Sequence, residues 1–120
     1  MRKKTLVLGA SLKTYRYSNL AIRRLVEKNH EVVAVGLRKG EVENVNIEIG
    51  LPCFDEVDTI TLYINPTRQI PLFDYVISLQ PKRVIFNPGT ENIEFIKLLQ
   101  ENTIETLMAC TLVLLSTNQY

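Results

Sequence analysis

Small and polar residues that could bind an anion follow the first apolar segment of the sequence. Gly9-Ala10-Ser11 comes directly after this segment, and Ser18-Asn19 opens the next segment with helical spacing. Glycine permits a tight turn and a close approach to a ligand, while the free amides at a helix start attract phosphate. Ser18 is also a favourable N-cap residue. These residues predict a phosphate-binding loop or, as the alternative, an ordinary strand-to-helix turn.

Two cations follow the second apolar segment, residues 32–36. Arg38 and Lys39 stand where a protein specific for unphosphorylated NAD would keep an acid for the ribose hydroxyls. Cations at this place favour a ligand that carries a ribose phosphate, which is either NADP or coenzyme A. The dinucleotide pattern G-x-G-x-x-G is missing, because residues 10–18 contain no glycine. The alternative interpretation is a solvated turn.

Two further polar turns follow later apolar segments. Asn65-Pro66-Thr67 ends the segment 60–64, and Asn87-Pro88-Gly89 ends the segment 84–86. Each turn places a proline near a predicted helix start, so helix capping alone could explain its composition. If the turns share one sheet edge with Gly9 and Arg38, they extend the same binding rim.

Catalytic groups do not converge on this rim. The one histidine, His30, is expected in a surface loop at the opposite sheet edge, and no serine stands in the pattern G-x-S-x-G. Cys110 falls on the rim, where it is either a buried, inert thiol or a reactive group. Cys53 and Cys110 lack the neighbours that a zinc site requires. We therefore expect neither a catalytic centre nor a metal site.

The rim requires strands that alternate with helices. Five apolar segments, including 106–109, have the length of strands, and helical spacing recurs around 21–26, 72–77 and 93–99. This order predicts an α/β fold, a Rossmann-like, doubly wound and mostly parallel sheet of five strands flanked by helices. We expect residues 40–58 to form an irregular connection with at most a short strand near Ile47. Residues 112–115 are expected to form a short terminal helix or turn.

Composition limits the range of partners. The chain has 120 residues, of which 46% are hydrophobic, and this suffices for one domain over residues 1–120. Its net charge of +1 provides no broad attraction for nucleic acid or an anionic membrane surface. No apolar segment reaches the length of a membrane span or of a signal-peptide core. Two widely spaced cysteines fit a reducing cytoplasm.

The sequence resembles the family of small, single-domain CoA-binding proteins, which are similar to the CoA-binding domain of the succinyl-CoA ligase alpha subunit. The resemblance spans essentially the whole chain and rests on an ordered set of segments: Gly9-Ala10-Ser11, Tyr17-Ser18-Asn19, Val35-Gly36 with Arg38, 87–92 and Cys110. It implies a Rossmann-like sheet that holds the nucleotide end of CoA at the first loop and the end of the second strand. The catalytic histidine of the ligases belongs to a domain that this sequence does not contain.

The resemblance also implies roles for individual residues. Residues 9–11 would face the diphosphate with support from Ser18 and Asn19, and Arg38 would meet the phosphate-bearing ribose. Apart from the resemblance, Tyr15 and Arg16 in the first loop are candidates for a stacking or phosphate contact, with an exposed loop as the alternative. The turns 65–67 and 87–89 would border the pantetheine. We thus expect non-catalytic binding of CoA or an acyl-CoA, by a protein that acts with a protein partner or as a homo-oligomer; the alternatives are an NADP-dependent oxidoreductase and a ligand-free scaffold.

Overall fold

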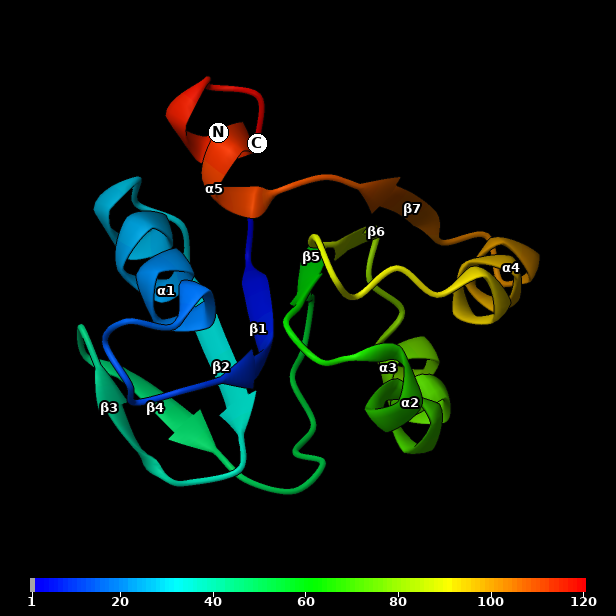
Figure 1. Cartoon of the computed structure of the whole chain (residues 1–120), viewed down its shortest axis with the longest axis horizontal. Helices are drawn as coiled ribbons and strands as arrows, with labels where there is room; N and C mark the ends of the chain where they lie inside the picture. The colour runs from blue at the N-terminus through cyan, green and yellow to red at the C-terminus, as the bar shows by residue number, and fades with distance from the viewer. Residues whose placement is uncertain (1) are drawn as a thin grey trace.

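The computed structural model describes residues 2–120 as alternating strands and helices (Figure 1). The strands are β1 (Thr5–Ala10), β2 (Val32–Gly36), β3 (Gly40–Val42), β4 (Val45–Glu48), β5 (Thr59–Leu62), β6 (Arg83–Phe86) and β7 (Glu105–Met108). The helices are α1 (Tyr17–Glu27), α2 (Pro66–Gln69), the 3-10 turn η1 (Ile70–Leu72), α3 (Phe73–Leu79), α4 (Ile93–Glu101) and α5 (Thr111–Ser116). None of the helices within 2–120 is long and apolar enough to cross a membrane.

All strands belong to one sheet with the order β3-β4-β2-β1-β5-β6-β7. Every neighbouring pair is parallel except β3 and β4, which are antiparallel. The chain moves from β1 to β2 on one side and later returns to place β5 on the other side of β1. The sheet is therefore doubly wound, and its order reverses at β1 and β5, where ligands of such folds bind.

Helices cover both faces of the sheet (Figure 1). On one face, Leu6 and Leu8 of β1 join a buried cluster with Val76 of α3 and Phe95 of α4. On the other face, Val7 joins a cluster that includes residues of α1 and α5. Successive residues of a strand point to opposite faces, so a continuous apolar strand such as β1 is what a sheet covered on both sides requires.

The prediction of five strands was wrong, because residues 40–48 form a hairpin. The five predicted strands correspond to β1, β2, β5, β6 and β7, and the hairpin adds β3 and β4. Its two-residue turn consists of Glu43 and Asn44, both at positive φ (51° and 64°), as a type I′ turn requires. Val45 and Ile47 of β4 are buried and extend the core beyond β2. The short strand expected near Ile47 is thus part of a larger element.

Candidate functional site

The parallel strands bring five connecting segments to one edge of the sheet, which we call the carboxyl edge. These segments follow β1 (residues 11–16), β2 (37–39), β5 (63–65), β6 (87–92) and β7 (109–110). The residues that the sequence analysis selected for binding lie in these segments, at the ends of the strands before them or in the first turns of the helices after them. The edge is centred on β1 and β5, where the strand order reverses.

Gly9 lies where β1 packs tightly against the chain that follows β5. Its φ is +101°, and a Cβ atom at this position would lie 2.6 Å from the backbone oxygen of Tyr63. The amide of Tyr63 in turn donates to the oxygen of Leu8 over 2.9 Å. The close backbone approach expected at Gly9 is therefore to Tyr63 of the same protein. This contact fixes the backbone at the start of the first loop.

Asn19 fastens the first loop onto α1. Its Nδ2 donates to the backbone oxygen of Ser11 (2.9 Å), and its Oδ1 accepts from Arg23 Nε (2.9 Å). Arg23 also donates to the oxygen of Thr14 (3.0 Å), and the hydroxyl of Ser11 accepts from the amide of Lys13 (3.1 Å). Because Asn19 is 1% exposed, its side chain holds the loop in place from inside.

The prediction that Ser18 caps α1 was wrong. The helix begins at Tyr17, its N-cap residue is Arg16, and Ser18 lies one residue inside the helix with 5% exposure. Arg16 provides no side-chain hydrogen bond to the helix start. The first amides of a helix lack partners within the helix, so the N–H groups of Tyr17 and Ser18 are free to bind an anion.

Cations gather where the first loop meets the turn after β2. A Cβ atom at Gly40 would collide with the side chain of Leu12, so the loop lies directly on this turn. Four exposed cations belong to these two segments, namely Lys13, Arg16, Arg38 and Lys39. None of them forms an ion pair with any residue between 2 and 120. The two segments themselves contain no acid, and we call this region the cationic corner.

The turn after β5 has the capping geometry that its sequence predicts. Asn65 is the N-cap residue of α2, and its Oδ1 accepts from the amide of Arg68 over 3.0 Å. Pro66 occupies the first position of the helix, where a missing N–H costs nothing. Asn65 and Thr67 are exposed at the carboxyl edge, so this turn offers polar groups to a ligand.

Asn87, in contrast, is buried and its hydrogen bonds are internal. Its Nδ2 donates to Thr61 Oγ1 (2.7 Å) and to the oxygen of Leu62 (2.8 Å), and its Oδ1 accepts from the amide of Thr111 (2.9 Å). With 2% exposure, Asn87 joins β5, β6 and α5. Pro88 and Gly89, which follow it, are exposed at the rim.

Sequence reasoning missed Gln69, which connects the segments after β5 and β6. The side chain is fully buried and bonds to Ile64, Thr90 and Asn92. Gln69 stands in a polar stretch between a turn and Ile70, where nothing in the sequence distinguishes it from an exposed helical residue. Two of its three partners, Thr90 and Asn92, are more than 20 residues away in the sequence, so only the fold reveals this bridge.

Cys110 lies at the carboxyl edge as its position after β7 predicts. It is the half-buried N-cap residue of α5. Burial, and after it the proximity of Cys110, raises the pKa of Tyr63 above its ordinary value of 10. The phenol of Tyr63 is therefore protonated at neutral pH and is not a general base.

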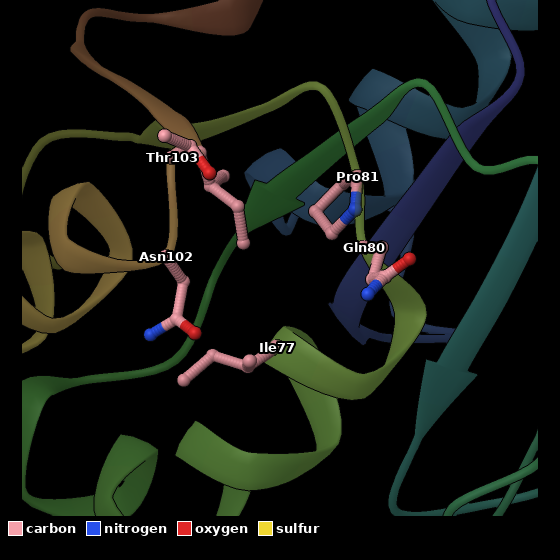
Figure 2. A pocket seen from close by; sticks show the side chains of 6 residues that line it. Ile77, Gln80, Pro81, Asn102 and Thr103 are labelled. Atoms are coloured by element: carbon pink, nitrogen blue, oxygen red, sulfur yellow. The ribbon is translucent and has the colours of Figure 1, made fainter.

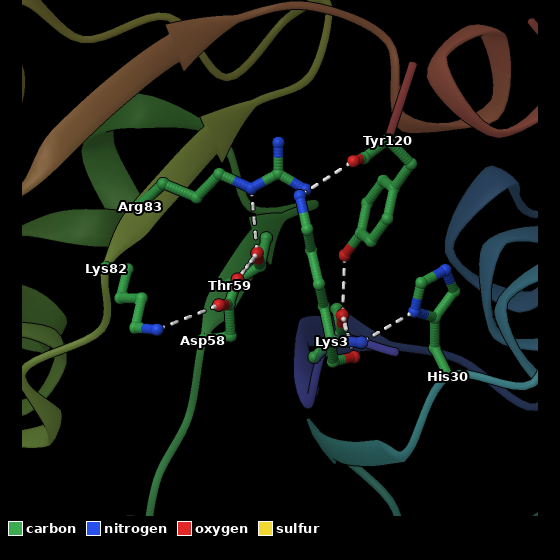
Figure 3. Close-up of polar contacts among 8 residues, drawn as sticks. Lys3, His30, Asp58, Thr59, Lys82, Arg83 and Tyr120 are labelled. Carbon is green, nitrogen blue, oxygen red and sulfur yellow. Dashed lines mark hydrogen bonds and ion pairs between the residues drawn. The ribbon is translucent and has the colours of Figure 1, made fainter. Parts of the chain in front are cut away.

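The amino edge of the sheet holds a separate polar cluster, which includes His30 (Figure 3). His30 Nδ1 accepts from the amide of Lys3 (2.9 Å), and its ring meets that of Tyr120 edge-on at 4.9 Å. The buried Arg83 donates through Nε to Thr59 Oγ1 (2.8 Å) and lies 4.5 Å from the centroid of the Tyr120 ring. His30 is thus far from the cationic corner, at the opposite edge that its position in the sequence predicts.

Two hollows of the protein lie away from the carboxyl edge. One of about 290 Å³ is bordered by Gln80, Pro81 and Thr103, at the loops that lead into β6 and β7 (Figure 2). The other, of about 480 Å³, runs between α1 and α5 past Leu20 and Val113. Neither combines cations with a free helix start, so we favour the cationic corner as the candidate site.

Comparisons with known proteins agree with this assignment of the fold. The sequence matches the family described as the CoA binding domain over residues 3–116. A crystal structure of an uncharacterized protein is 51% identical, with a TM-score of 0.97 over 100% of this chain and 99% of that chain. Two further structures are similar: a Thermus thermophilus protein (25% identity, TM-score 0.84, 99% of this chain and 91% of that chain) and a conserved hypothetical protein from Pyrococcus furiosus (26%, 0.80, 94% and 98%). A search of curated proteins finds no match.

Proposed function

Because the chain belongs to the CoA-binding domain family, we propose that it binds coenzyme A at the carboxyl edge without catalysing a reaction. The cationic corner carries this proposal, since it combines unpaired cations with the free amides at the start of α1. Phosphates are held by charge-assisted hydrogen bonds from arginine and by helix starts. The four cations suit a ligand with three phosphate groups better than an uncharged one.

The nucleotide half of CoA would occupy the cationic corner. The backbone of Gly9-Ala10-Ser11 and the start of α1 would face the diphosphate, while Asn19 would hold the loop in shape and Ser18 would contribute its amide. Arg38 would meet the 3′-phosphate of the ribose, and Arg16 would contact a phosphate from the N-cap position. This arrangement agrees with the fixed shape of the first loop and with the lack of acids in residues 11–16 and 37–39.

The pantetheine half would run along the segments after β5 and β6. Asn65, Pro66 and Thr67 would form one border, and Asn87, Pro88 and Gly89 would form the other. Asn87 would act by supporting its exposed neighbours, because its own amide is engaged within the protein. Pantetheine carries amide groups but no charge, which fits the weaker charge of these segments.

The proposal extends to the role of the protein in the cell. CoA or an acyl-CoA would be carried or sensed, rather than converted, by one domain over residues 1–120. Such a role would involve a protein partner or a second copy of the chain. Two unpaired cysteines, Cys53 and Cys110, support a cytoplasmic location.

Calorimetric titration with CoA, dephospho-CoA, NADPH and NADH tests the proposal. We expect CoA to bind more tightly than dephospho-CoA, because dephospho-CoA lacks the 3′-phosphate that Arg38 would contact. Binding of NADPH without CoA would instead favour an NADP-dependent oxidoreductase. No heat with any of the four ligands would contradict both functions and favour a ligand-free scaffold.

A further inference from the structure

Gln69 forms a buried bridge between the two segments that border the proposed pantetheine site. Its Nε2 donates to the backbone oxygens of Ile64 (2.8 Å) and Thr90 (2.7 Å), and its Oε1 accepts from Asn92 Nδ2 (3.1 Å). Ile64 follows β5, whereas Thr90 and Asn92 follow β6. One buried amide therefore connects the two segments directly.

The geometry of this bridge leaves Gln69 no alternative partners. The side chain is 0% exposed, and both hydrogens of its amide nitrogen are used by carbonyl groups. A buried amide that loses its hydrogen bonds is costly, so the two segments are held in one arrangement. An apolar side chain of similar size would fill the same space without fixing this arrangement.

Further hydrogen bonds connect the partners of Gln69 to the exposed turns at the carboxyl edge. Asn92 caps α4 through Oδ1, which accepts from the amide of Phe95 (3.3 Å), and its Nδ2 also reaches the oxygen of Pro66 (3.4 Å). The amide of Thr90 donates to the oxygen of Asn87 (2.9 Å) and closes the turn that presents Pro88 and Gly89. Hydrogen bonds thus connect the bridge to both exposed turns, 65–67 and 87–89.

We propose that Gln69 is a positioning residue that fixes the binding site of the pantetheine arm and leaves the nucleotide site unaffected. This inference rests on the proposed function. The nucleotide site has its own support, because the first loop is held by Asn19 and Arg23. The bonds of Asn19 and Arg23 include none of the groups that Gln69 contacts, so the two halves of the ligand should respond separately to a change at Gln69.

The test compares CoA with adenosine 3′,5′-bisphosphate, a nucleotide fragment without the pantetheine arm. In Gln69→Met, we expect the affinity for CoA to fall about tenfold, or about 1.4 kcal/mol. The affinity for the fragment should change less than about twofold, a difference of about 0.4 kcal/mol. Gln100→Met is the matched control, because Gln100 is exposed on α4 and its side chain bonds only to Thr106 (3.3 Å) among residues 2–120. It should change neither affinity.

A second variant keeps the test decisive if Gln69→Met does not fold. Asn92→Asp retains the oxygen that caps α4 but replaces the amide donor that faces Gln69 Oε1 with an acceptor. It should therefore also lower the affinity for CoA more than the affinity for the fragment. An equal loss for CoA and the fragment, or an unchanged affinity for CoA, would overturn the positioning role. Failure of the unaltered protein to bind either ligand would instead contradict the proposed function.

Discussion

Replacement of Gly9 by alanine tests the packing that shapes the candidate site. The structure gives two reasons for a loss of stability in Gly9→Ala. The φ of +101° is unfavourable for alanine, and the new Cβ would lie 2.6 Å from the backbone oxygen of Tyr63. Backbone strain costs about 1–2 kcal/mol and overpacking about 1–3 kcal/mol, so the free energy of unfolding should fall by about 2–5 kcal/mol.

Gly89→Ala is the matched control for this prediction. Gly89 also has a positive φ, +91°, but nothing lies within 4 Å of the position that its Cβ would take. The control should therefore lose only the strain contribution, about 1–2 kcal/mol. The loss of conformational freedom in the unfolded chain is the same for both glycine-to-alanine changes and cancels in the comparison.

Urea denaturation followed by circular dichroism measures both free energies of unfolding. The slope of the free energy with urea should stay the same, because both variants expose the same surface on unfolding. Equal losses in Gly9→Ala and Gly89→Ala would refute the contact with Tyr63 as the cause. The comparison also matters for ligand studies, since a weakened fold in Gly9 variants would reduce binding without any direct contact to the ligand.

Three further predictions concern Arg38, Asn87 and His30. Arg38→Ala should weaken the binding of CoA by about 1.5–3 kcal/mol in calorimetry and leave the binding of dephospho-CoA unchanged. Equal losses of affinity for the two ligands would contradict a contact with the 3′-phosphate. Asn87→Leu should lower the free energy of unfolding by about 3 kcal/mol in urea, because it leaves buried groups of β5 and α5 without partners. Burial and, after it, nearby positive charges that include Lys3 lower the pKa of His30 below 6.5. The stability that neutral His30 provides should be present above pH 6.5 and decrease as the pH falls below it, whereas His30→Gln should remove this part of the pH dependence.

The core strands could be predicted because their apolar character does not depend on distant contacts. Residues 6–8 and 84–86 are continuous apolar segments, as strands covered on both faces must be. The hairpin of β3 and β4 escaped prediction because its strands are short and its turn, Glu43-Asn44, lacks the glycine that usually marks a type I′ turn. The local signal was therefore too weak without its pairing to β2.

The candidate site could be predicted at the level of segments but not of side-chain roles. The parallel direction of the strands, which their alternation with helices predicts, places Gly9, Arg38 and the later turns at the carboxyl edge. That Asn19 and Asn87 point inward depends on the packing of α1 and α5, which the sequence does not specify locally. The bridge made by Gln69 likewise requires the contact between segments that are more than 20 residues apart.

The most direct test of the account is to map CoA on the protein by two-dimensional ¹H–¹⁵N NMR. Addition of CoA should shift the amide signals of Gly9, Ser11 and Ser18, and also those of Arg38 and Gly89, because these residues border the proposed site. Dephospho-CoA should give the same pattern with a smaller shift at Arg38. Shifts confined to the hollow beside Pro81, or to the groove between α1 and α5, would contradict binding at the carboxyl edge.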